Sequence, residues 1–196
     1  GGLYVFSDEG QRVFARFGQP PVSLVPMMLD QNLRNTKQIA STFATLTPIR
    51  MRLFGGDGPQ VHFIECEPTE AMEAGDDAVD ELIDDGWRPE DIALLTTGSR
   101  HLEQSERQAR GQAEYWETLW DAEQVFYGHV LGFKGLERSA IVLVLNETHV
   151  GERSRERIYV GLSRARDQLV VCGSSAMIRA IAGEDVVRAL IPGRGS

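Results

Sequence analysis

The feature that most constrains the fold is a regular alternation of short apolar runs with longer polar or amphipathic stretches. Continuous apolar runs occur at 61–66 (VHFIEC), 91–96 (DIALLT), 140–145 (AIVLVL) and 168–173 (QLVVCG). A strand that is buried on both faces has this appearance, and connections long enough for a helix allow neighbouring strands to run parallel. The pattern predicts an α/β fold, a three-layer sandwich with a mostly parallel sheet and helices on both faces.

The remaining segments refine this prediction. Shorter apolar runs predict further strands at 3–6, 22–29 and 124–128. Helices are expected over 36–46, 70–86 and 152–165 and in two short segments after residue 173, while 99–120 is either helix or loop. In the acidic helix, the expected buried stripe consists of Ala71, Ala74, Ala78, Leu82 and Ile83.

Composition limits the class of protein. The chain has 196 residues, 42% of them hydrophobic, which suits one large or two small globular domains. We find no apolar run of about 20 residues and no signal peptide, and therefore expect a cytoplasmic protein without a membrane partner. Cys66 and Cys172 lie in apolar runs, which favours buried thiols over a disulfide. The cysteines and four histidines have no zinc-ligand spacing.

Charge is distributed unevenly along the chain. The net charge is −9, but the acidic side chains concentrate between residues 51 and 150, while residues 1–50 and 151–196 are basic. Only this distribution bears on an anionic partner. Eighteen arginines accompany two lysines. Arginine suits bidentate phosphate contacts, although genomic base composition explains the same bias.

Two stretches place polar residues beside the end of a strand or the start of a helix. In LYVFSDEGQ, a strand delivers Asp8, Glu9 and Gln11 to its carboxyl end, where parallel sheets bind ligands. In LDQNLRNTKQIA, Arg34 adjoins a predicted helix N-terminus, which attracts phosphate. The alternatives are an ordinary acidic turn in the first stretch, and a helix-capping Asn35 beside a solvated arginine in the second.

Two later stretches carry a similar ambiguity. GFKGLE (132–137) places two glycines around Lys134, which permits either close approach of a ligand or an ordinary turn before a strand. In the segment that ends in YVGLSRARDQL, Arg153, Arg157 and Arg164 are spaced to share one face of a helix. That face is either a phosphate-binding surface or a solvated basic one.

Taken together and in order, SDEGQ, NLRNT, FKGLE and YVGLSRARDQL resemble motifs III, IV, V and VI of UvrD/Rep-type superfamily 1 helicases. The resemblance covers roughly residues 3–173, and motifs V and VI are its most specific parts. The forms NLRNT and LGFKGLE look most like the helicase-like halves of NERD-type (nuclease-related) bacterial proteins. The resemblance implies a RecA-like sandwich. Residues 1–20 would be the last strand and motif III of a first RecA-like domain, and residues 21–196 the second RecA-like domain.

The resemblance also implies a ligand and partners. In this family ATP with Mg²⁺ binds between two RecA-like domains, and single-stranded DNA crosses their top. Neither lysine of this chain follows a glycine, so it has no phosphate-binding loop of the G-x-x-x-x-G-K-[ST] form. An upstream RecA-like domain of the same protein would supply that loop and the Mg²⁺ carboxylate. We therefore expect the chain to be inactive by itself.

Site residues follow from the resemblance position by position. Gln11 would sense the γ-phosphate, while Arg34 and Arg164 would be arginine fingers that stabilise charge developing on the phosphoryl oxygens. Glu137 would bind the ribose, with Gly135 in the same nucleotide-binding turn.

DNA contacts would come from three residues, His129, Lys134 and Arg16. The family pattern is less well kept here. His129 and Leu131 replace the threonine and histidine usual in motif V, and the aromatic and arginine after motif III appear in reversed order as Arg16 and Phe17. DNA binding therefore departs further from the family than ATP binding.

A different class of function also fits the sequence, namely a non-catalytic docking or regulatory module that keeps the helicase fold. Its partner surface would be the acidic helix at 70–85. The retained Gln11, Arg34, Glu137 and Arg164 favour the motor domain, because buried arginines without phosphate are costly. We expect the motif loops to gather at the carboxyl ends of the strands, with the acidic helix away from that edge.

Overall fold

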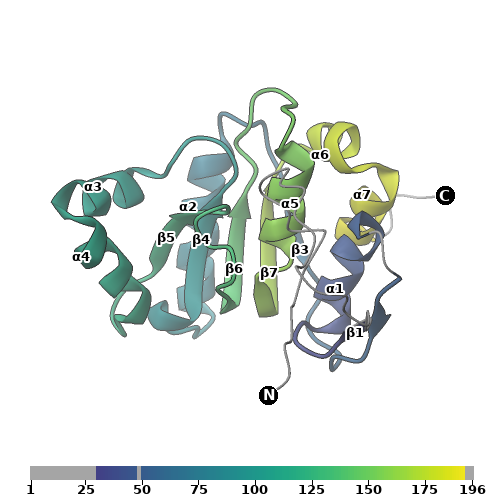
Figure 1. Cartoon of the computed structure of the whole chain (residues 1–196), viewed down its shortest axis with the longest axis horizontal. Helices are drawn as coiled ribbons and strands as arrows, with labels where there is room; N and C mark the ends of the chain where they lie inside the picture. Colours follow the sequence, from purple (N-terminus) through teal and green to yellow (C-terminus); the bar gives the residue numbers. More distant parts are fainter. Residues whose placement is uncertain (1–29, 48–49, 193–196) are drawn as a thin grey trace, which may run out of the picture.

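The computed structural model describes residues 30–47 and 50–192. Its centre is a parallel sheet of five strands in the order β3-β7-β6-β4-β5, with helices on both faces (Figure 1). The predicted class is confirmed: the chain is an α/β three-layer sandwich consistent with the RecA-like architecture. The predicted strands at 3–6 and 22–29, and with them Gln11 and Arg16, lie outside the described residues.

All five strands arise from the apolar runs. They are β3 (His62–Glu65), β4 (Ile92–Thr96), β5 (Phe126–His129), β6 (Arg138–Val144) and β7 (Ala165–Gly173). In β4 every residue is buried, as expected for a strand covered on both faces. The central pairing aligns Ala93 with Ile141 and Leu143 with Val171. A separate parallel pair joins β1 (Gln31–Asn32) to β2 (Arg52–Leu53).

The helices occupy the predicted intervals with shorter bounds. They are α1 (Lys37–Phe43), α2 (Ala71–Asp84), α3 (Leu102–Arg110), α4 (Gln112–Glu117), α5 (Ser154–Leu162), α6 (Ser175–Ala182) and α7 (Glu184–Leu190). Three short 3₁₀ turns cover Ala44–Leu46, Pro89–Asp91 and Thr118–Trp120. The undecided segment at 99–120 is therefore helical for most of its length.

Among the described residues, α2 is the helix that covers one face of the sheet. A Cβ at Gly75 would lie 2.5 Å from Val144 Cγ2, so glycine lets the helix approach the strands closely. Ala71, Ala78 and Leu82 are buried as predicted, but Ile83 is 38% exposed. Ala74 is half-buried, and Gly75 and Val79, which the predicted stripe leaves out, complete the buried face.

The other face is covered by α1, α5, α6 and α7, while α4 and the turn after it cover its far edge. Phe43 of α1 packs edge-on against Tyr159 of α5, with ring centroids 5.9 Å apart. The expectation that Arg153, Arg157 and Arg164 share a helix face is wrong. Helix α5 ends at Leu162 and starts at the opposite edge of the sheet, so Arg164 is separated from the other two arginines.

Candidate functional site

The candidate residues divide between the two edges of the sheet. The expectation that all motif loops follow strand carboxyl ends is wrong. Glu137 and Arg164 come immediately before β6 and β7 and therefore lie at the amino edge, whereas His129 ends β5 at the carboxyl edge. We refer below to the amino-edge cluster (Arg34, Asn35, Glu137, Ser163 and Arg164) and the carboxyl-edge pocket.

The NLRN segment is docked on the turn between α5 and β7. The side-chain oxygen of Asn32 accepts hydrogen bonds from the backbone N–H groups of Arg34 and Asn35, both at 3.1 Å. Asn35 Nδ2 then donates to the Ala165 carbonyl at 2.5 Å. Asn35 does not cap α1, because the cap is Thr36, whose hydroxyl accepts from Ile39 N. The two asparagines thus connect the NLRNT segment to the segment YVGLSRARDQL.

This docking fixes the direction of Arg34. Its Nη2 donates to the Ser163 carbonyl at 2.8 Å, and its Nη1 lies 3.4 Å from Glu137 Oε2. Both side chains remain about 40% exposed, at 42% and 40%. Three segments far apart in the sequence therefore present an oriented cation and a carboxylate at one open edge.

Arg164 differs from the expected arginine finger. Its side chain is buried, with a residue exposure of 1%. Its guanidinium donates to the carbonyls of Val160 and Leu136, at 3.1 and 3.3 Å, and to the Ser163 hydroxyl. In this position it ties α5 to the GFKGLE loop (132–137) and does not face solvent.

The motif V loop runs between the two edges. Phe133 anchors it in the core at 1% exposure, while Lys134 and Gly135 are exposed. Gly135 has φ +87°, a conformation that other residues rarely adopt, so the glycine is required for the turn. Lys134 is accessible to an anionic partner, and Gly135 stands two residues before Glu137 in the amino-edge cluster.

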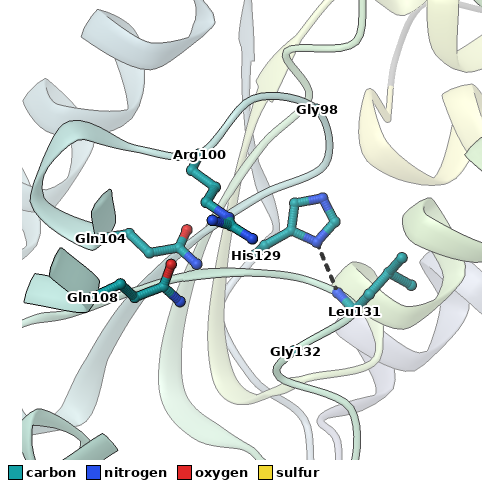
Figure 2. A pocket seen from close by; sticks show the side chains of 7 residues that line it. All are labelled: Gly98, Arg100, Gln104, Gln108, His129, Leu131 and Gly132. Carbon is teal, nitrogen blue, oxygen red and sulfur yellow. Dashed lines mark hydrogen bonds between the residues drawn. The ribbon is translucent and has the colours of Figure 1, made fainter. Parts of the chain in front are cut away.

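A pocket of about 430 Å³ opens at the carboxyl edge. It is lined by Gly98, Arg100, Gln104, Gln108, His129, Leu131 and Gly132 (Figure 2). Asn146, at the end of β6, holds the wall formed by residues 98–100, because its Oδ1 accepts from Gly98 N at 2.8 Å and its Nδ2 donates to Ser99 O at 3.0 Å. A Cβ at Gly98 would lie 2.8 Å from the Asn146 carbonyl oxygen, so this approach needs glycine.

His129 contributes a ring to this pocket, not a charge. Burial is the main cause that lowers its pKa, and the nearby Arg157 and Arg100 lower it further. Its Nε2 lies 3.1 Å from Thr97 O, and its Nδ1 accepts from Leu131 N at 3.2 Å. With one nitrogen donating and the other accepting, the neutral ring is held by the backbone on both sides. The expected phosphate contact by this side chain is therefore not supported by the geometry.

Gln104 is a candidate that sequence reasoning missed. It lines the pocket and is only 3% exposed. Its Oε1 has no hydrogen-bond partner among the residues that the structure describes. A buried unpartnered carbonyl is costly, so it marks a place where a ligand or water would bind. The only sequence signal was the spacing of Arg100, Gln104 and Gln108 by four residues.

We expected the acidic helix α2 to lie away from the carboxyl edge, but it contacts a residue beside the pocket there. Asp76 in its second turn contacts His101, with Nε2 and Oδ1 3.1 Å apart, and His101 directly follows the pocket residue Arg100. Cys66 and Cys172 are free thiols, as predicted, but only Cys172 is buried and Cys66 is half-buried. Burial raises the pKa of Cys172 to about 12. Within residues 30–47 and 50–192, no cluster of three metal-ligating side chains and no helix suited to crossing a bilayer occurs.

Comparison with known proteins finds similarity at the level of structure. No family model and no curated protein matches the sequence. The structure is similar to one described as the C-terminal domain of a possible DNA helicase from Lactobacillus plantarum WCFS1, with 19% identity and a TM-score of 0.49. The match covers 82% of this chain and 94% of that one. Function must be inferred from the residues of this chain.

Proposed function

We propose that the chain is the second RecA-like motor domain of a UvrD/Rep-type superfamily 1 ATP-dependent DNA helicase or translocase. ATP with Mg²⁺ would bind between its amino-edge cluster and an upstream RecA-like domain that carries the phosphate-binding loop. Two observations support this proposal. The four motifs follow one another in the family order, and the fold is consistent with a RecA-like sandwich.

The observation that carries the proposal is the meeting of motifs IV, V and VI at one edge. Arg34, Glu137 and Ser163 come from separate segments and are linked by contacts of 2.8 and 3.4 Å. An exposed guanidinium whose direction is fixed by a backbone carbonyl suits a phosphoryl group, because little ordering remains to be done when the phosphate arrives. The neighbouring carboxylate suits a ribose hydroxyl.

Within this proposal, Arg34 is the arginine finger. The guanidinium would exchange its contact with Glu137 for the γ-phosphoryl oxygens, which leaves Glu137 able to accept from the ribose. Arg164 is a positioning residue here, because it holds the Ser163 turn and Leu136 on either side of that contact. The Mg²⁺ ligands and the catalytic water would belong to the upstream domain, and Gln11 would connect the two halves.

Separating and rejoining the two domains tests this proposal. This chain alone, the upstream domain alone and the two joined are assayed for ATP hydrolysis. We expect turnover only from the joined protein, because each part holds half of the nucleotide site. Hydrolysis by the purified chain alone would contradict the proposal, as would a joined protein no faster than the upstream domain.

A non-catalytic docking module is the second candidate, and one observation favours it. Arg34 is already paired with Glu137, and Arg164 is already satisfied by carbonyls, so the cluster is stable without phosphate. In that case an upstream phosphate-binding loop would be absent, and the acidic surface of α2 would bind a basic partner. Equal partner binding with and without ATP would favour this module over the motor.

A further inference from the structure

We infer that the carboxyl-edge pocket holds one base of a bound single strand and selects bases that carry an exocyclic amine. The inference deepens the proposed function and rests on its single-stranded DNA partner. Its starting point is the unpartnered Oε1 of Gln104, a side chain that is 97% buried and lines the pocket.

Tyr115 determines which way the Gln104 amide faces. The Tyr115 hydroxyl donates its hydrogen to the Tyr127 carbonyl at 3.0 Å, so toward Gln104 its oxygen can only accept. The NH₂ of Gln104 can donate to that oxygen, which leaves Oε1, on the side of Arg100 in Figure 2, as the atom without a partner. Burial raises the pKa of Tyr115 to about 12, so the hydroxyl keeps its proton throughout the physiological range. The pocket consequently presents a fixed acceptor.

The surroundings suit a nucleotide. A volume of about 430 Å³ lies within the range of small-molecule pockets. Arg100 is exposed and has no ion pair or hydrogen bond within the described part of the chain, which leaves its guanidinium available for a phosphate. The neutral ring of His129 lines the pocket from the other side, and rings of this kind stack on bases (Figure 2).

The fixed acceptor discriminates between bases. Adenine and cytosine carry an exocyclic amine that can donate a hydrogen bond to Gln104 Oε1. Thymine carries one ring N–H between two carbonyl oxygens, and these oxygens would repel the oxygen of Gln104. A neutral hydrogen bond of this kind corresponds to a preference of roughly three- to tenfold. Gln108 also lines the pocket and is half-buried. Its side-chain amide would be a second contact to the bound single strand.

The test measures affinity of this chain for 12-nucleotide dA, dC and dT strands by fluorescence anisotropy at several salt concentrations. We expect dA and dC to bind about three- to tenfold more tightly than dT. Gln104→Met removes the acceptor at similar volume and should bring all three strands within about twofold. Gln60→Met, at an exposed position before β3 on the far side of the sheet, is the matched control and should keep the preference.

Arg100→Gln should weaken every strand equally and reduce the log–log salt slope by about 0.7, because it removes one phosphate contact. If circular dichroism shows that Gln104→Met does not fold, the ligand is changed in place of the protein. N6,N6-dimethyladenine in the dA strand removes the amine hydrogens that would donate to Gln104. Equal binding of the dA, dC and dT strands would overturn the inference about the pocket and leave the motor proposal intact. A preference that survives both Gln104→Met and the dimethylated adenine would do the same. Failure of every strand to bind while the joined protein hydrolyses ATP would also overturn it.

Discussion

The two edges of the sheet are built on different physical principles. At the amino edge, exposed charges meet: Arg34 and Glu137 are each about 40% exposed and are held by distant segments. At the carboxyl edge, the neutral amides of Gln104 and Gln108 and the imidazole of His129, whose two nitrogens are held by backbone groups, surround a pocket with a single exposed cation, Arg100. Exposed charge suits an ionic ligand that arrives and leaves, while buried amides suit recognition of a neutral group.

This difference leads to a separation of functions. Under the two proposals, nucleotide chemistry would depend on charge placed with fixed direction in the amino-edge cluster, and strand recognition would depend on hydrogen bonding in the carboxyl-edge pocket. A substitution at one edge should therefore leave the activity of the other nearly unchanged, because the central strands β4 and β6 between them are buried along almost their whole length and closely packed.

The largest effect is expected from Arg34→Ala in the joined protein. Removal of an arginine finger costs on the order of 10³ in ATP turnover. The affinity for dA strands should stay within about twofold, because the pocket lies at the opposite edge. Arg52→Ala is the matched control, since Arg52 is exposed and ion-paired with Asp30 but lies outside the amino-edge cluster.

Steady-state ATPase assays and anisotropy measure the two quantities on the same preparation. A fall in turnover of less than tenfold would exclude Arg34 from the role of finger. A parallel loss of strand affinity would show that the two edges are coupled.

Arg164→Ala should act mainly on stability. The side chain donates hydrogen bonds to Val160 O and Leu136 O from a buried position. Its removal takes a donor from both carbonyls, although Val160 O still accepts from the Ser163 hydroxyl. We expect a loss of roughly 2–3 kcal/mol, because hydrogen bonds made by charged groups contribute about that much. For a chain of this size the loss corresponds to a fall in Tm of roughly 4–12 °C.

Thermal denaturation followed by circular dichroism measures this loss. Arg188→Ala, at an exposed arginine of α7 paired with Asp185, should change Tm by no more than about 2 °C. If Arg164→Ala keeps its Tm but abolishes turnover in the joined protein, Arg164 leaves its buried position during the reaction and acts as a second finger.

Sequence reasoning predicted the layers well and the edges poorly, for physical reasons. Parallel strands covered on both faces appear as uninterrupted apolar runs, which is why β4, β6 and β7 were located within a few residues. The amino-edge position of Glu137 could also have been read from the sequence. It stands directly before a run of strand residues, and residues before a parallel strand lie at its amino end.

Other features depend on contacts that periodicity does not contain. Helix propensity gives no reason to bury Gln104, and its burial follows from packing of α3 and α4 around Tyr115. Likewise, Arg164 has the sequence of an exposed basic residue at a helix end. Its burial follows from the way the motif V loop passes over it.

A smaller effect is expected from Glu137→Ala in the joined protein. The ribose does not change during phosphoryl transfer, so loss of a ribose contact should raise KM for ATP about tenfold with little change in kcat. The exposed pair with Arg34 contributes at most about 1 kcal/mol, so Tm should hardly move. Glu137→Gln, which keeps an acceptor, should restore most of the affinity. An equal fall in kcat with constant KM would show that Glu137 acts by orienting Arg34.

The smallest effect concerns the pH dependence contributed by His129. Burial lowers the pKa of this histidine in the folded chain below its usual value of 6.5. The unfolded chain therefore takes up a proton more readily as pH falls through that value. The stability from the neutral ring is complete above pH 6.5 and is lost as pH falls toward the folded pKa, by at most about 1.4 kcal/mol per pH unit.

Replacement of the ring by a group that does not titrate isolates this contribution. His129→Asn should lose less stability between pH 7 and pH 5 than the parent chain does, as measured by urea denaturation at each pH. His62→Asn, at an exposed position on β3, is the matched control and should keep the parental pH dependence. A His129→Asn profile parallel to that of the parent would mean that the folded chain takes up a proton on this ring as readily as the unfolded chain does. A charged ring would donate from both nitrogens, so the contact from Leu131 N–H could not form and the carboxyl-edge pocket would carry a second cation beside Arg100.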